Sequence, residues 1–184
     1  MAKTYKAKLM TDTKVRTGKV RLSYPHLFEK YDKSDKYQCQ LIIDKDDKDT
    51  LACIKKAIEN AKADGKSSKW GGKIPGGLRN PLNDGDAMDE GGEVYENTYY
   101  VNAKSTRKPQ VVDLDRDDIF DPEELYAGCY VRATIVFFPY DNSGAGVGVL
   151  LNNVQKLDDG ERLGGGAASA DTDFADDEDD DLMG

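Results

Sequence analysis

Basic and aromatic side chains occur together on segments whose apolar residues alternate as they do in β-strands. In residues 97–108 and 129–138, tyrosine, lysine and arginine occupy positions that alternate with a predicted apolar face. Cations contact the phosphates of a nucleic-acid strand while aromatic rings stack on unpaired bases, at about 1–3 kcal/mol per base. The candidate nucleic-acid-binding residues are Lys19, Arg21, Lys36, Trp70, Tyr100, Lys104, Arg107, Lys108, Tyr130 and Arg132.

Each of these residues also has a purely structural interpretation. Exposed tyrosine, lysine and threonine on a strand can simply reflect β-propensity and solubility. Trp70, the single tryptophan, lies in a loop rich in glycine and lysine (KSSKWGGK). Its ring either anchors that loop on the core or stacks on a base. Because the basic and aromatic pattern recurs on several predicted strands, the sequence favours binding.

Charge is distributed unevenly along the chain. The 184 residues have a net charge of −9, but the segment from Asp158 onward contains 11 acidic residues and one basic residue, Arg162. The remainder therefore has a net charge of +1, and its first forty residues contain ten Lys and Arg against four Asp and Glu. This asymmetry, rather than the total, indicates a basic body that suits a polyanionic partner.

The acidic residues are concentrated near the C-terminus. Residues 170–183 (ADTDFADDEDDDLM) contain eight acidic side chains and no basic one. Such a segment has the repeating negative charge of a nucleic-acid backbone, so we expect it to compete with nucleic acid for a basic groove. Residues 164–169 (GGGAAS) predict a flexible hinge before this acidic tail.

Catalytic functions find little support in the sequence. His26 is the single histidine, which removes most mechanisms that need a Ser–His or Cys–His pair. Four aspartates in residues 113–118 could bind Mg²⁺ in a nuclease, but consecutive carboxylates in a loop are more often solvated. We therefore predict a protein that is not an enzyme and needs no metal or other cofactor.

Cysteine usage and hydropathy bear on the compartment. Cys39, Cys53 and Cys129 are scattered among apolar neighbours, which predicts buried reduced thiols rather than a disulfide framework or a zinc site. No stretch approaches the ~20 apolar residues of a membrane span. Residues 1–12 lack the apolar run of a signal peptide. The expectation is a cytoplasmic protein that does not associate with a membrane.

The hydrophobic pattern predicts a mainly β domain with one principal helix. Helical spacing of the apolar residues predicts a helix over 46–63, which Gly65 ends. Residues 65–96 are rich in glycine, proline and asparagine and predict a long functional loop. The predicted strands are 14–24, 36–43, 97–105, 109–113, 129–138 and 146–155.

These elements predict an α+β fold built on an OB-fold-like five-stranded β-barrel. We expect this domain to span residues 1–160, and residues 161–184 to form the hinge and a disordered acidic tail. Alternation in the first strand predicts that Val20, Leu22 and Tyr24 face the core, and that Lys19, Arg21 and Ser23 face solvent. In 36–43 the same pattern predicts that Lys36, Gln38 and Gln40 point outward.

The sequence resembles a family of bacteriophage single-stranded-DNA-binding proteins that have an OB-type core and an acidic C-terminal tail. The matching stretches cover most of the chain in order, so the resemblance is specific. They are GKVRLSYPHLFE (18–29), KYQCQLII (36–43), KWGGK (69–73), NAKS with the following PQVVD (102–113), GCYVRA (128–133) and GVLLNNVQKLDDGERLGG (148–165).

The resemblance implies an accessory protein of phage DNA replication, recombination or repair that coats exposed single strands. By analogy, the tail would recruit replication or recombination proteins as partners. Tails of this functional class usually end in an aromatic or apolar tip, whereas this chain ends in Leu-Met-Gly. The candidate partner-binding residues of the tail are Phe174, Asp179, Asp180, Asp181, Leu182 and Met183.

The leading hypothesis is sequence-independent binding of single-stranded DNA in the cytoplasm of a host cell. The alternative is an interaction protein whose acidic segment mimics nucleic acid and inhibits a host DNA-processing factor. These hypotheses predict opposite results, because in the second the isolated tail acts alone and the body retains no oligonucleotide. The choice between DNA and RNA and the oligomeric state stay open at the level of sequence.

Overall fold

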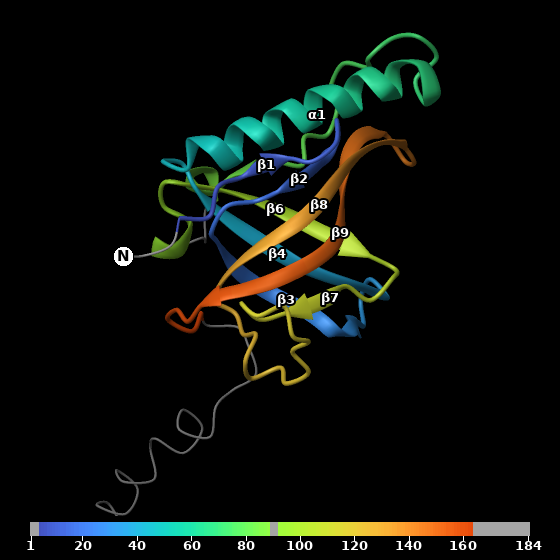
Figure 1. Ribbon diagram of the computed structural model, residues 1–184. Coiled ribbons are helices and arrows are strands. Elements are labelled where there is room, and N and C mark those ends of the chain that lie inside the picture. Colours follow the sequence, from blue (N-terminus) through green and yellow to red (C-terminus); the bar gives the residue numbers. More distant parts are fainter. Residues whose placement is uncertain (1–3, 89–91, 164–184) are drawn as a thin grey trace, which may run out of the picture.

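The computed structural model of the chain describes residues 4–88 and 92–163 (Figure 1). Nine strands, one long helix and two short 3₁₀ turns make up this part of the chain. The elements are β1 (Lys8–Leu9), β2 (Lys14–Arg16), β3 (Val20–Tyr31), β4 (Lys36–Asp44), α1 (Lys48–Ser68), β5 (Asn83–Asp84), η1 (Gly85–Ala87), η2 (Glu93–Tyr95), β6 (Thr98–Ser105), β7 (Gln110–Val112), β8 (Tyr130–Asp141) and β9 (Ala145–Asp158).

Five of the strands form a closed ring. β3 pairs with β4, β4 with β6, β8 with β9 and β8 with β3, all antiparallel, while β6 and β9 run parallel. Closure leaves these five strands without a free edge between them. The ring is the OB-type barrel that the sequence predicts, and the α+β fold class is confirmed. The short strands β1, β2, β5 and β7 extend the sheet at its margins.

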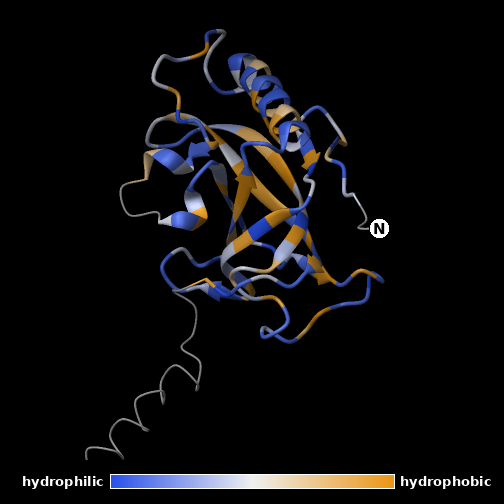
Figure 2. Ribbon diagram, turned by 90° about the vertical axis from the view of Figure 1, so that its left-hand side faces the viewer, coloured by the Kyte–Doolittle hydropathy of each residue, from blue (hydrophilic) through white to orange (hydrophobic). Residues whose placement is uncertain are grey.

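The core lies inside the ring, as the alternation of apolar residues predicts. On β8, Val131, Ala133, Ile135 and Phe137 are buried, while the residues between them are at least partly exposed. Figure 2 shows hydrophobic residues concentrated on the strands that enclose this interior. Burial of this apolar surface is the main term that stabilises the barrel. The outer face of the same strands is therefore free to carry polar and aromatic residues.

Helix α1 packs across one end of the barrel (Figure 1). Asp47 caps its N-terminus, since its side chain accepts a hydrogen bond from the backbone N–H of Thr50. The prediction that Gly65 ends the helix is wrong, because α1 continues to Ser68. Gly65 is needed for close packing instead: a Cβ at this position would lie 2.6 Å from Pro139 Cβ and 2.7 Å from the Trp70 ring.

The predicted strand over 14–24 is two strands, β2 and β3. Between them the side-chain oxygen of Thr17 accepts a hydrogen bond from the N–H of Ala133, and the N–H of Gly18 donates to Thr50 Oγ1. The expected alternation fails at Ser23, which is 4% exposed, and at Tyr24, which is 53% exposed. A shift in the β3–β4 register after Ser23, with a positive φ of 45° at Tyr24, reverses the two faces there.

The segment predicted as a loop over 65–96 contains regular structure. Helix α1 occupies its beginning, and β5, η1 and η2 lie in its second half. Lys45 Nζ fixes that half to the barrel through ion pairs of 2.9 Å to Asp84 and 2.6 Å to Asp86. Within residues 4–88 and 92–163, no helix has the length and apolar character needed to cross a membrane.

Candidate nucleic-acid interface

A groove of about 400 Å³ crosses the outer face of the barrel, over β6 and the hairpin formed by β8 and β9. Two of the predicted residues, Lys36 and Lys104, line it together. The other groups that give the groove its chemistry are Asn102, Phe138, Tyr140 and Leu150. The groove therefore combines ammonium groups with aromatic and aliphatic surface, which is the combination that holds phosphates beside bases.

Two aromatic rings of the hairpin rest on glycines of the facing strand. Phe138 pairs with Gly148 and Tyr140 pairs with Gly146 across the β8–β9 ladder. A Cβ on Gly148 would lie 2.5 Å from the Phe138 ring, and one on Gly146 would collide with the Tyr140 hydroxyl. Because glycine has no side chain, each ring is able to lie over the neighbouring backbone. Phe138 keeps 41% of its surface exposed.

Phe138 and Tyr140 are not among the residues that the sequence predicts, although a signal for them exists. The outward positions of FFPY in 137–140 face the glycines of GAGVG in 144–148 once the two segments form a hairpin. At the level of sequence, a turn alone accounts for those glycines. Aromatic residues placed opposite glycines on paired strands indicate rings that cover backbone, which is the arrangement in the groove.

Trp70 positions this hairpin rather than lining the groove. Its indole Nε1–H donates a hydrogen bond of 3.2 Å to the carbonyl of Tyr140, and its half-buried ring packs on the core beside Gly65. Arg79 holds the other side of the hairpin, donating through its backbone N–H to Ala145 and through Nη2 to the Ser143 carbonyl. These contacts fix the strands that carry the two rings.

Tyr100 lies next to the groove. It pairs with Asn83 of β5, which lines the groove, and its ring meets that of Tyr95 edge-on at 5.5 Å. The Tyr95 hydroxyl donates to Gln40 Oε1, and Gln40 Nε2 donates to Asn102 Oδ1 at 3.2 Å. Burial raises the pKa of Tyr95, which further favours the neutral phenol that donates this hydrogen bond. Gln40 therefore lies on the outer face, as the alternation predicts, but this network leaves it only 8% exposed.

Three other predicted residues form a separate group at the far end of β8. The Tyr130 ring has Lys19 Nζ at 4.8 Å and Arg21 Cζ at 5.7 Å from its centroid. Arg21 also donates to the backbone carbonyls of Gly128 and Glu161. Tyr130 pairs with Asp158 of β9, and Lys104 pairs with Leu150 of the same strand. These two β9 residues are eight positions apart. At a rise of about 3.3 Å per residue, the two groups are about 26 Å apart along the strand.

The remaining predicted residues lie at other places. Arg107 and Lys108 are exposed in the turn after β6, and Lys108 lines a smaller hollow with Phe28 and Phe120. Arg132 lies on the outer face of β8, where its Nε–H donates to Gln155 Oε1 at 2.7 Å. The structure thus brings Lys36 and Lys104 together but does not gather all ten residues in one trough. The six predicted tail residues lie outside the described residues.

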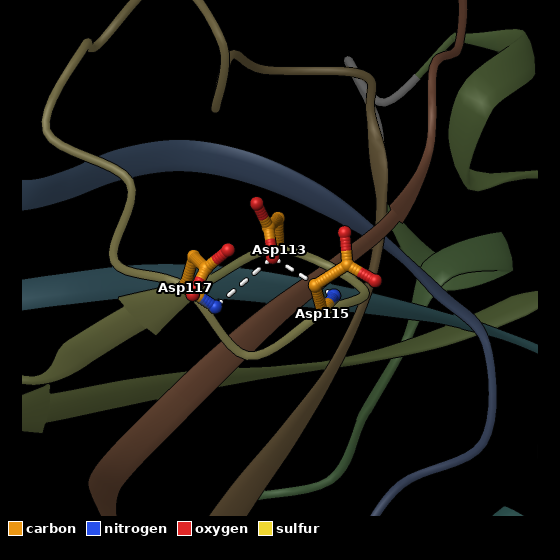
Figure 3. Close-up of side chains that lie close together, drawn as sticks. All are labelled: Asp113, Asp115 and Asp117. Carbon is orange, nitrogen blue, oxygen red and sulfur yellow. Dashed lines mark hydrogen bonds between the residues drawn. The ribbon is translucent and has the colours of Figure 1, made fainter.

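The acidic loop after β7 has a local structural explanation. Figure 3 shows Asp113, Asp115 and Asp117, whose carboxylate oxygens lie within 4.8 Å of one another. Asp113 Oδ1 accepts hydrogen bonds from the backbone N–H groups of Asp115 at 2.9 Å and Asp117 at 3.0 Å. One carboxylate therefore stabilises the turn, and the exposed neighbours are solvated. These hydrogen bonds give the Asp113 side chain a structural role in the turn.

The five-stranded ring, with a groove across its outer face, places the chain among the OB-fold proteins. The profile of a protein family described as "Enterobacter phage Enc34, ssDNA-binding protein" matches residues 13–183. The chain belongs to this family of phage single-stranded-DNA-binding proteins. Protein p50 of Acyrthosiphon pisum secondary endosymbiont phage 1 is 32% identical over 177 residues, which cover 89% of this chain and 93% of p50.

Solved structures agree with this assignment. The single-stranded DNA-binding protein from bacteriophage Enc34, in complex with single-stranded DNA, superposes with a TM-score of 0.72 at 28% identity, covering 89% of this chain and 97% of that one. The gp2.5 single-stranded DNA-binding protein of bacteriophage T7 superposes with a TM-score of 0.59 at 15% identity, covering 85% and 97% of the two chains. The second similarity concerns the fold alone.

Proposed function

We propose that this protein binds single-stranded DNA without marked sequence specificity, in the groove over β6 and the β8–β9 hairpin. The observation that carries the proposal is the groove itself, where Lys36 and Lys104 lie beside the rings of Phe138 and Tyr140. Membership of a single-stranded-DNA-binding family and the similarity to a relative solved with single-stranded DNA support it.

The chemistry of the groove favours an unpaired strand. Rings stack on bases only where those bases are not already stacked within a duplex, and every base has an aromatic face. Lysine ammonium groups contact phosphates without reading sequence. Binding of this kind would protect exposed strands during phage DNA replication, recombination or repair in the host cytoplasm, with no catalytic step.

The acidic tail enters the proposal as a competitor and a recruiting segment. Its eight acidic residues imitate the charge of a DNA strand, so it would occupy basic surface when DNA is absent and leave it when DNA binds. Phe174, Leu182 and Met183 supply the apolar groups that a replication or recombination partner would contact. Removal of residues 171–184 would therefore raise the affinity for DNA at low salt.

A fluorescence-anisotropy titration tests this function. Full-length protein and a form ending at residue 170 are titrated with labelled oligo-dT and with duplex of equal length, at two salt concentrations. We expect tight binding of oligo-dT, weaker binding of duplex, and an affinity that falls with salt with a slope of about 0.7 per phosphate neutralised. Failure of both forms to retain oligo-dT, with the isolated tail inhibiting a DNA-processing enzyme, would establish nucleic-acid mimicry instead.

A further inference from the structure

A second group of cations lies on the outer face of β1, β2 and β8, away from the groove. Arg16 of β2 pairs with Lys8 of β1 on one side and with Thr134 of β8 on the other. Residues directly opposite each other on paired antiparallel strands point to the same face. Arg132 lies two residues before Thr134 on β8 and shares this face, because side chains alternate along a strand.

Among the described residues, the two arginines form no ion pair. Arg16 Nε is buried and finds no hydrogen-bond acceptor within residues 4–88 and 92–163. Burial and the neighbouring charge of Arg16 lower the pKa of Arg132. Since guanidinium groups stay protonated, the fold holds two like charges together, and an anion between them would offset that cost.

Arg132 is already oriented for such an anion. Its Nε–H donates to Gln155 Oε1 at 2.7 Å, and Gln155 Nε2 in turn donates to the Asp113 carbonyl at 3.0 Å. The Tyr5 ring covers the guanidinium, with its centroid 5.2 Å from Cζ. With Nε bonded to Gln155, the terminal amino groups of Arg132 are the donors left for a ligand. Arginine binds phosphate through paired N–H donors of this kind.

The outer face of β8 connects this arginine pair to the groove. One face of the strand carries, in order from the groove, Phe138, Val136, Thr134 and Arg132. Lys14 of β2 pairs with Val136, so a further cation lies along this route. Arg132 lies six positions before Phe138 on β8, which is about 20 Å at 3.3 Å per residue.

We infer that Arg16 and Arg132 form a phosphate site for the part of the DNA strand that leaves the groove along β8. The inference rests on the proposed function, because it extends the path of the same strand. It assigns Arg16 a role that the sequence did not indicate. It also predicts that this site contacts only strands long enough to reach beyond the groove.

Oligonucleotides of two lengths test the inference. The variants are Arg16→Gln, Arg132→Gln and their combination. Lys56→Gln, on the exposed face of α1, is the control that removes one charge, as each single variant does. Anisotropy is measured with oligo-dT of about 4 and about 16 nucleotides, the range of site sizes for one OB fold. We expect the double variant to bind the long strand about tenfold more weakly, with a salt slope lower by about 0.7 for each phosphate that is no longer neutralised. Binding of the short strand should match wild type.

Each outcome decides the question. Wild-type affinity and salt slope of the double variant on the long strand would overturn the inference and leave the proposed function intact. Equal losses on both lengths would also overturn it, because the arginines would then act at the groove or on the fold. Failure of the wild-type protein to bind either strand would instead remove the proposed function. Thermal unfolding shows whether Arg132→Gln is folded. If it is not, Arg132→Lys replaces it, because lysine keeps the charge and removes the paired donors. We then expect a lower affinity for the long strand alone.

Discussion

Both ends of the β8–β9 pair carry aromatic rings, but the surroundings of those rings differ. At the hairpin end, the rings of Phe138 and Tyr140 rest on glycine backbone and line an open groove. At the far end, the ring of Tyr130 has two cations of the same chain, Lys19 and Arg21, within cation–π distance. A base that stacks on the face of the ring beside these cations has to displace them. We therefore expect the availability of a ring, more than its residue type, to decide whether it stacks on DNA.

The largest effect is expected from removing the two hairpin rings. Phe138→Ala with Tyr140→Ala removes stacking on two bases, at about 1–3 kcal/mol each, which corresponds to a decrease in affinity of about 30-fold or more. Tyr130→Ala, the matched change at the other end, should cost clearly less. Anisotropy with oligo-dT at one salt concentration measures both. A larger decrease for Tyr130→Ala would reverse the comparison.

The next effect concerns the glycine beneath Phe138. In Gly148→Ala the new Cβ would lie 2.5 Å from the Phe138 ring, so the ring must move out of its place in the groove. We expect part or all of the stacking on one base to disappear, at a cost of at most about 3 kcal/mol. Gly76→Ala is the control, because a Cβ at Gly76 meets no atom within 4 Å. Equal affinities of the two variants for oligo-dT would show that packing of the Phe138 ring over Gly148 does not contribute to binding.

The lysines of the groove should act mainly through salt dependence. Lys36→Gln and Lys104→Gln are each expected to lower the slope of log affinity against log salt by about 0.7, uniformly across sequences. Lys19→Gln, at the end where the cation lies over Tyr130 and pairs with Asp158 at 3.5 Å, should change the slope less. Titrations over a salt series measure the slopes, and identical slopes for all three variants would contradict the assignment.

The smallest effect is expected at Trp70. Trp70→Phe keeps an aromatic ring but removes the hydrogen bond to the Tyr140 carbonyl, which should cost about 1 kcal/mol in the free energy of unfolding. Chemical denaturation measures this change. Because the ring positions the hairpin from behind, we expect only a minor change in affinity for oligo-dT. A decrease as large as that of the hairpin double variant would mean that Trp70 itself stacks on DNA.

Much of the fold could be predicted from local pattern. Alternating residues such as Val131 and Ala133 locate the core strands, because one face of each strand is buried in the barrel. The prediction fails where tertiary contacts override local preference. Local pattern predicts a helix end at Gly65, yet this residue lies within α1, where the missing Cβ leaves room for Pro139 and Trp70.

The candidate interface was predicted in part. Alternation predicts Lys36 and Lys104 as outward cations on separate strands, and the β4–β6 register brings both to the groove. Phe138 fits an apolar strand at the level of sequence, and the β8–β9 register is what places it opposite Gly148. Arg16 carries no local signal, because its charged neighbour, Arg132, is more than a hundred residues away in the chain.

The sequence by itself determined the strand pattern, the single helix, the division of charge and the supply of basic and aromatic groups. These properties depend on residues that are neighbours in the chain, and periodicity and composition express them directly. Only the tertiary structure decided which rings are open and which cations converge. Both properties depend on pairing between strands that are far apart in the sequence. That pairing places Phe138 opposite a glycine and places Tyr130 beside two cations.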